Sequence, residues 1–291
     1  MEVAQKTYIC CSWKTSKMKE LLTRSLTGLV FISLLIFSVF YSEAAILAVF
    51  TIFGLLCLFE FSRLINLKGF IQYIIFLITL GVFVFWKQLQ PEIQIEEATL
   101  ILLVFSIFVS LFLIRDLFTK KAIPLFKFKK YLLTTFYLSS GFAFLLLIPL
   151  ATNNHNPYII LGSFILVWVN DSFAYITGKN FGRQKLFASI SPKKTVEGFL
   201  GGLLFSCIAS YFIAKFTETS LSFSNWLILA IIISSIGTIG DLIQSKFKRQ
   251  ANVKDSGSIL PGHGGIFDRL DSMLFSAPFI YLFLKILHYV S

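Results

Sequence analysis

The sequence predicts an all-α polytopic membrane protein with about nine transmembrane helices and a cytoplasmic N-terminus. Of its 291 residues, 56% are apolar and only 14% are charged, whereas about 25% are charged in a typical soluble domain. Mean hydropathy is +0.79. Apolar blocks of near-spanning length recur along the chain, and Lys and Arg gather in alternate gaps between them. These observations exclude an ordinary soluble protein.

Nine apolar blocks are the expected membrane helices, each near the ~20 residues that cross the hydrocarbon layer. They lie at 25–41, 44–61, 70–86, 98–114, 131–150, 158–178, 198–216, 225–243 and 272–290. We divide the chain into a basic cytoplasmic tail (1–24), N-terminal transmembrane helices (25–150) and a C-terminal catalytic transmembrane region (151–291). Before about residue 150 the ionisable residues sit mostly in loops, so chemistry is expected at 165–275.

The basic residues set the orientation of the predicted helices. Alternate polar segments hold 23 of the 26 Lys and Arg residues, namely 1–24, 62–69, 115–130, 179–197 and 244–271. Cytoplasmic loops are enriched in such residues, so these segments are expected to face the cytoplasm. The formal charge of +11 therefore reflects orientation and attraction to anionic membrane lipids, and it does not indicate a nucleic-acid partner.

Asp171 follows Asn170 inside an apolar block and is the first candidate for chemistry. On a single helix it would lie roughly 10 Å below the cytoplasmic end. A buried carboxylate in a membrane helix needs a partner or a function. The alternative to a functional role is an ion pair with Lys179 or Lys185.

The loop at 179–197 carries five cations, which serve at least as an orientation signal. Ser191 and Pro192 predict that a helix starts there, because Ser favours the N-cap and Pro the first helical position. Lys193 and Lys194 would then lie in the first turn, where the helix dipole disfavours cations. A bound phosphate would resolve that conflict.

Further carboxylates are expected at the ends of the last two helices. Asp241 would end the eighth helix, where a carboxylate opposes the dipole and needs a bound cation or an ion pair with Lys246. Asp268 and Asp271 would share a face at the start of the last helix, a place that also suits acids without any function. With Asp171 they make four carboxylates near one membrane surface, and Mg²⁺ prefers such oxygen ligands.

Residues 245–271, here called the signature stretch, combine cations, carboxylates and glycines between two apolar blocks. Cations bind phosphates, carboxylates bind divalent metals, and glycines let backbone N–H groups approach an anion. This composition indicates a phosphate and metal site at a membrane surface. His263 is either a general base or a hydrogen-bonding residue in a Gly-rich turn.

The signature stretch resembles that of the phosphatidate cytidylyltransferases, also called CDP-diacylglycerol synthases. The matching residues, in the same spacing, are Ser245, Lys248, Arg249, Lys254, Asp255, Gly257, Pro261, His263, Gly264, Gly265, Asp268, Arg269 and Asp271. Segments 168–182 and 191–202 also resemble parts of that family, whereas the first 150 residues match only as apolar spans.

The resemblance implies that CTP and phosphatidic acid react, with Mg²⁺, to give CDP-diacylglycerol and pyrophosphate. The implied catalytic residues are Asp241, Asp268, Asp271, Lys248, Arg249 and a positioning His263, with Asp241 and Asp268 holding the metal. The implied substrate- and phosphate-binding residues are Asp171, Ser191, Lys193, Lys194, Lys254, Asp255, Gly264, Gly265 and Arg269.

Two other functions stay open at this point. A CTP-dependent lipid kinase of the polyprenol type is the first, because such kinases distantly resemble the family. An ion-coupled transporter that uses Asp171 is the second. We expect an integral protein of a bacterial inner membrane with its site facing the cytoplasm; whether it forms a homodimer stays open.

Overall fold

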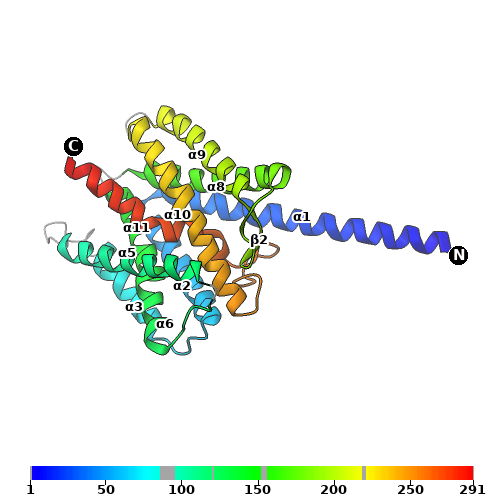
Figure 1. The fold of residues 1–291 in the computed structure, drawn as a ribbon, viewed down its shortest axis with the longest axis horizontal. Helices are drawn as coiled ribbons and strands as arrows, with labels where there is room; N and C mark the ends of the chain where they lie inside the picture. The colour runs from blue at the N-terminus through cyan, green and yellow to red at the C-terminus, as the bar shows by residue number, and fades with distance from the viewer. Residues whose placement is uncertain (1, 86–95, 120, 152–155, 218–220, 291) are drawn as a thin grey trace.

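The computed structural model describes residues 2–85, 96–119, 121–151, 156–217 and 221–290, with side chains from residue 22 to residue 289 outside the gaps. This part of the chain is almost entirely helical (Figure 1). Its elements are α1 (Glu2–Tyr41), α2 (Glu43–Leu64), α3 (Ile71–Leu80), η1 (Gly81–Phe85), α5 (Glu96–Phe118), α6 (Lys127–Leu133), η2 (Thr134–Ser139), α7 (Ser140–Leu147), η3 (Ile148–Leu150), α8 (Pro157–Phe181), β1 (Lys185–Phe187), β2 (Ser191–Thr195), α9 (Val196–Phe216), α10 (Phe223–Gln250) and α11 (Phe267–Val290).

The predicted all-α membrane fold is confirmed. Within the described residues, eight helices are long and apolar enough to cross a membrane, and a shorter apolar helix occupies Ile71–Phe85. Each of the nine apolar blocks expected from the sequence falls on one of these helices. The protein is therefore an integral membrane protein.

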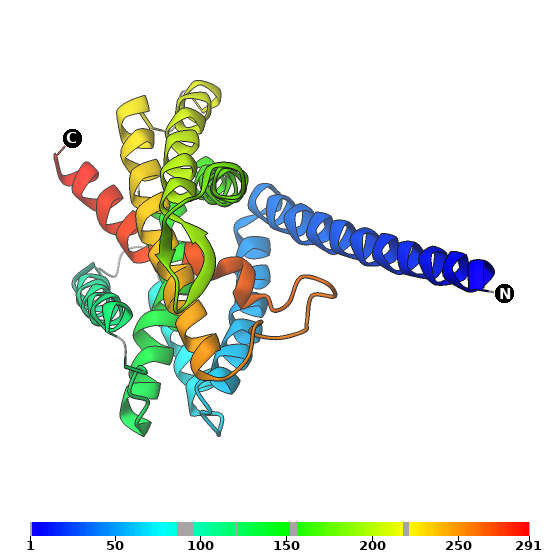
Figure 2. The same ribbon diagram turned by 45° about the vertical axis from the view of Figure 1, so that its right-hand side comes forward.

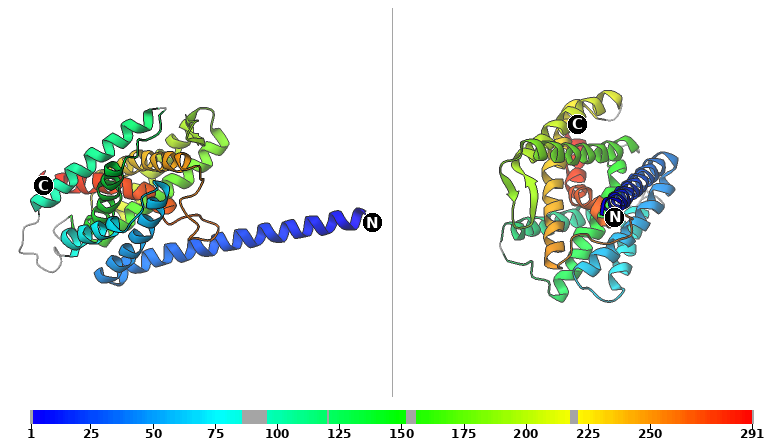
Figure 3. Two further views of the ribbon diagram at one scale, coloured as in Figure 1. Left: turned by 90° about the horizontal axis from the view of Figure 1, so that it is seen from below. Right: turned by 90° about the vertical axis from the view of Figure 1, so that its right-hand side faces the viewer.

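Helices α8 to α11 form the half of the bundle that carries the signature stretch (Figure 1). Small residues let α8 and α9 approach closely, which is typical of helix packing in membranes. A Cβ at Gly202 would lie only 2.7 Å from the carbonyl oxygen of Asn170. The first helix, α1, packs mainly on α2 and continues beyond the bundle (Figure 3).

A cluster of buried aromatic rings joins α2, η2, α10 and α11. The Phe61 ring meets those of Tyr137, Phe247 and Phe267 edge to face, with centroids 5.3–5.7 Å apart. Such pairs each contribute about 0.5–1.5 kcal/mol beyond burial. The chain neighbours of Phe61, Phe247 and Phe267 are Glu60, Lys248 and Asp268, so the cluster fixes the backbone from which these polar side chains extend.

The basic segments meet at one end of the bundle. Lys130 Nζ donates to the carbonyl of Asn66, and the backbone N–H of Ile123 donates to the Gln250 side chain. Arg249 Nε donates to the carbonyl of Ile190. These contacts connect segments 62–69, 115–130, 179–197 and 244–271, as the alternation of basic loops requires.

The predicted helix start at Ser191 is wrong. Residues Ser191–Thr195 form β2, which pairs with β1 in an antiparallel hairpin. Helix α9 begins at Val196, and the side chain of Thr195 caps it by accepting from the N–H of Gly198 at 3.1 Å. Pairing with β1 satisfies backbone groups that a helix would otherwise use. Lys193 and Lys194 therefore lie on a strand, and the conflict with the helix dipole does not arise.

Candidate active site

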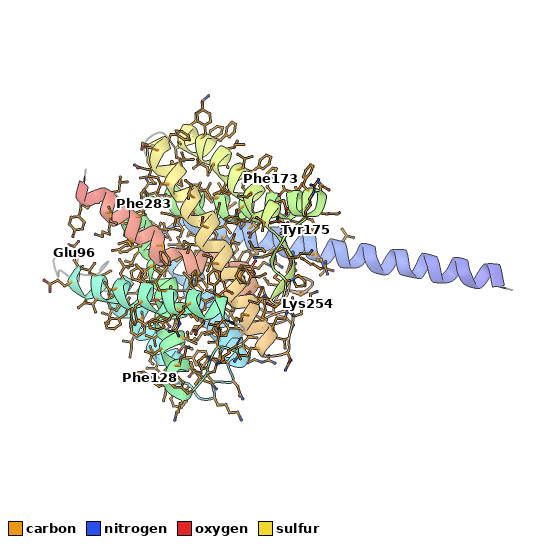
Figure 4. The ribbon with its side chains drawn as sticks, in the orientation of Figure 1. Glu96, Phe128, Phe173, Tyr175, Lys254 and Phe283 are labelled. Atoms are coloured by element: carbon orange, nitrogen blue, oxygen red, sulfur yellow. The ribbon has the colours of Figure 1, made fainter. Side chains whose placement is uncertain are left out.

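A cavity of about 710 Å³ opens between the β1–β2 hairpin, helices α8 to α11 and the loop that joins α10 to α11. That loop, residues 251–266, is here called the glycine-rich loop. Its tip reaches toward α1 (Figure 2). The cavity lies at the end where Figure 4 shows Tyr175 and Lys254, and Glu96 and Phe283 mark the opposite end.

The structure brings most of the predicted site residues into this one cavity. Its lining includes Asp171, Lys193, Lys194, Asp241, Lys248, Asp255, His263, Asp268, Arg269 and Asp271. They come from three helices (α8, α10 and α11), the hairpin and the glycine-rich loop. Carboxylates and cations thus face one space, the combination that phosphates and a divalent metal both need.

Asp241 does not end its helix, contrary to the sequence prediction. Helix α10 continues to Gln250, so the macrodipole gives no reason for a cation at Asp241. Its carboxylate forms an ion pair with Lys194 Nζ at 2.5 Å and accepts from Ser245 Oγ at 3.3 Å. The alternative partner, Lys246, instead donates to the carbonyls of Asp116 and Thr119.

Asp268 is the most heavily hydrogen-bonded carboxylate of the cavity. Its Oδ1 accepts from Lys248 Nζ at 2.8 Å and from Gln244 Nε2 at 3.1 Å. Its Oδ2 accepts from the N–H of Ser256 at 2.8 Å and from the N–H of Gly265 at 3.0 Å. Four donors therefore hold Asp268 in place, and a metal would have to displace Lys248 or Gln244 to reach it.

Asp171, Asp241 and Asp271 form a second group of carboxylates, from α8, α10 and α11, that lie within electrostatic range of one another. Asp171 accepts from the Asn170 amide at 3.3 Å. Lys194 and Arg269 are the cations that act on it electrostatically. The described residues show no ion pair between Asp171 and either Lys179 or Lys185.

These side chains fit Mg²⁺ only together with a substrate. In the part of the chain that the structure describes, no three His, Cys, Asp or Glu side chains stand close enough to hold a metal ion alone. Mg²⁺ usually takes one or two carboxylates and fills its other positions with water and substrate phosphates. Asp241, flanked by Asp171 and Asp271, suits that mode of binding.

His263 lies in a tight turn of the glycine-rich loop. Gly262 and Gly264 on either side have φ of +77° and +86°, a conformation that glycine adopts without strain. The ring Nδ1 is 2.7 Å from Thr27 Oγ1 of α1. Partial burial, helped by Arg269 and Arg24, lowers the pKa of His263 below its ordinary value of 6.5. The imidazole is therefore neutral at neutral pH.

Five predicted site residues do not line the cavity. They are Ser191, Arg249, Lys254, Gly264 and Gly265. Arg249 connects α10 to the hairpin, because it donates to the carbonyls of Ile190 and Val253. The N–H of Gly265 faces Asp268, so it is already used within the protein.

Several residues of the site were not assigned a role from the sequence. Lys179, Lys185, Tyr175 and Thr238 line the cavity, and the two lysines had been considered only as loop cations and as alternative ion-pair partners of Asp171. Glu60 is more unexpected, since it lies on α2, far from the region where chemistry was expected. A single acid within an apolar span was the signal that could have found it.

The fold and the site together define a mainly helical membrane protein with a cavity of cations and carboxylates between its C-terminal helices. Residues 22–287 match the model of the Cytidylyltransferase family, and the chain belongs to that family.

Curated relatives agree with this assignment. Proteins named phosphatidate cytidylyltransferase from Staphylococcus saprophyticus and Staphylococcus haemolyticus are 44% and 43% identical to this chain over 153 residues. One from Staphylococcus aureus is 42% identical over 155 residues. Each match covers 53% of this chain and 57% of the relative.

Proposed function

We propose that this protein is a phosphatidate cytidylyltransferase, which joins CTP and phosphatidic acid to give CDP-diacylglycerol and pyrophosphate. The observation that carries the proposal is the cavity, which combines cations with carboxylates at one end of a membrane bundle. Both substrates are anionic and one is a lipid, so they need such a cavity beside the bilayer. The family and the names of the relatives support the same reaction.

The reaction requires an oxygen of the phosphatidate phosphate to attack the α-phosphorus of CTP. A new P–O bond forms, and the bond from the α-phosphorus to the oxygen that bridges to the β-phosphorus breaks, so pyrophosphate leaves. A phosphate monoester has a second pKa of about 6 and is already largely dianionic at neutral pH. No general base is needed, which agrees with a positioning role for His263.

Cations of the cavity would neutralise the substrate phosphates. Lys194, Lys248 and Arg269 line the cavity, and the first two are paired with Asp241 and Asp268. Substrate phosphates compete with Asp241 for Lys194, and binding would therefore free the Asp241 carboxylate. Catalysis of this type depends mainly on positioning and on charge neutralisation.

Mg²⁺ is part of the proposal, with Asp241 as its principal protein ligand and Asp171 and Asp271 close by. When bound, the ion would neutralise charge that builds up on the phosphate oxygens. We further propose that the cavity faces the cytoplasm of a bacterial cell, because two of the segments rich in Lys and Arg, 179–197 and 244–271, contribute to its lining.

The position of the bond broken in CTP tests this function. Purified protein in mixed micelles with Mg²⁺ and phosphatidic acid receives CTP labelled at the α- or the γ-phosphate. We expect labelled lipid from α-labelled CTP alone, together with released pyrophosphate, and none after Mg²⁺ is chelated. Lipid labelled from γ-CTP would indicate a kinase. No labelled lipid from protein that binds CTP would exclude both enzymes for this substrate.

A further inference from the structure

Glu60 is a charged residue of the N-terminal half that the proposed reaction does not use. It lies one turn before the end of α2, and its side chain is only 1% exposed. An acid inside a membrane helix is costly and needs partners. All its hydrogen-bond partners among the described residues belong to the signature stretch, about two hundred positions further along the chain.

The Glu60 carboxylate binds the start of α11. Its Oε1 accepts from the N–H of Ile266 at 3.2 Å, and its Oε2 accepts from the N–H of Phe267 at 2.9 Å. These N–H groups stand at the N-terminus of α11, where no helical carbonyl reaches them and the dipole favours a negative charge. Glu60 thus caps α11 from another helix.

The glycine-rich loop is shaped around the same carboxylate. A Cβ at Gly257 or at Gly265 would collide with the Glu60 side chain. Both glycines have ordinary backbone angles, since neither is among the residues with positive φ. They are therefore required for space, which Glu60 fills at Gly257 and which Ser256 and Glu60 fill together at Gly265.

Ser256 connects Glu60 to the cavity. Its hydroxyl donates to Glu60 Oε2 at 2.9 Å, and its backbone N–H donates to Asp268 Oδ2 at 2.8 Å. Asp268 in turn accepts from Lys248 Nζ at 2.8 Å, and both of these residues line the cavity. A continuous set of hydrogen bonds therefore runs from α2 through the loop to a cation of the site.

We propose that Glu60 is a positioning residue for the cytidylyltransferase reaction. It holds the glycine-rich loop and the first turn of α11 so that Asp268 presents Lys248 to the substrate phosphates. The role rests on the proposed function, and it acts through Ser256 and Asp268 without contact with substrate. A displacement of about 1 Å at such a site costs roughly 100-fold in rate.

Glu60→Gln is the sharpest variant, because it keeps the shape and removes one acceptor. Each Glu60 oxygen faces a backbone N–H, so the Gln NH₂ group must oppose one of them in either orientation. We expect kcat/KM per folded molecule to fall about 100-fold. Hydrogen exchange should speed up in peptides of residues 253–267 and stay unchanged in α8 and α9.

Two matched variants complete the experiment. Glu97→Gln removes an exposed acid at the start of α5 and should leave kinetics and exchange at wild-type values. Ser256→Ala should lose activity by itself. Adding Glu60→Gln to Ser256→Ala should reduce activity much less than Glu60→Gln does in the wild type. The reason is that the effects of substitutions within one hydrogen-bond network do not add.

Each outcome decides the proposal. Wild-type kcat/KM and exchange in Glu60→Gln would overturn it. Uniformly faster exchange with unchanged turnover per folded molecule would make Glu60 merely structural and would also overturn it. Inactive wild-type and Glu97→Gln proteins would reject the proposed function instead. Exchange in residues 253–267 would then still show whether Glu60 orders the loop.

Discussion

Asp241 and Asp268 are both predicted metal ligands, but the structure holds their side chains in different ways. Asp241 is about 29% exposed and has one cation partner, whereas Asp268 is 8% exposed and accepts from four donors. Asp241 can therefore exchange Lys194 for a metal at little structural cost. If the Asp268 carboxylate gave up its donors to bind a metal, Lys248 would be left unpaired in a buried position, which is costly.

Asp241→Asn should reduce activity by about 100- to 1,000-fold, the scale of losing one electrostatic group at such a site. The Mg²⁺ concentration for half-maximal activity should rise, while the yield of folded protein stays at the wild-type level. Asp268→Asn should lose activity and folded protein together, as judged by size-exclusion chromatography in detergent. Near-normal turnover in Asp241→Asn at low Mg²⁺ would remove Asp241 from the metal site.

The contact between α1 and the glycine-rich loop belongs to the scale of elements. Thr27 Oγ1 can donate its single hydrogen to the carbonyl of Thr23, Arg24 or Pro261. The tautomer of His263 sets the direction of its bond to Thr27: either Nδ1–H donates to Oγ1, or the Thr27 hydroxyl donates to Nδ1. A long helix that packs mainly on α2 thereby orients a side chain of the cavity.

Thr27→Val should loosen this contact at nearly constant volume. A typical hydrogen bond contributes about 1 kcal/mol, so we expect roughly a fivefold increase in exchange of the loop tip and a smaller loss of activity than in Asp241→Asn. The matched control is Thr51→Val, because the Thr51 hydroxyl has no partner among the described residues. Equal exchange in both variants would show that Thr27 does not hold the loop.

The partial burial of His263, beside Arg269 and Arg24, gives the loop a defined pH dependence. Folding lowers the pKa of His263, so the unfolded loop binds the proton more tightly than the folded one. The stabilisation is complete above the ordinary pKa of 6.5 and is lost as the pH falls through the lowered pKa. Protection of the loop tip, relative to the intrinsic exchange rate at each pH, should therefore fall below pH 6.5 in the wild type and respond less in Thr27→Val.

At the scale of the whole molecule, the basic segments define one face of the bundle. Single cysteines at 62–69, 115–130, 179–197 and 244–271, on a cysteine-free background, should resist an impermeant thiol reagent in whole cells. Lys215→Cys, near the exposed end of α9, should react readily. Labelling at 244–271 from outside would contradict both the orientation and the proposed access of CTP.

The sequence predicted the membrane helices well because hydropathy reports directly on burial in lipid. It placed helix ends poorly where polar residues continue a helix beyond the bilayer, as in residues 244–250 of α10. The hairpin at 185–195 and the partners of Glu60 depend on contacts between distant segments. No local pattern encodes such contacts, so the charges of the site could be listed from the sequence but their pairing could not.

The partners of Glu60 also impose an order on biosynthesis. Residues 60 and 266 are separated by 206 positions, and ribosomes add about 5–20 residues per second. The acid on α2 therefore enters the membrane about 10 to 40 s before the backbone amides that donate hydrogen bonds to it are made. Until then α2 carries an uncompensated acid in a membrane helix. A chain that stops before residue 266 never gains the N–H groups that bind this acid. The last membrane helix thus supplies hydrogen-bond donors that the second membrane helix needs.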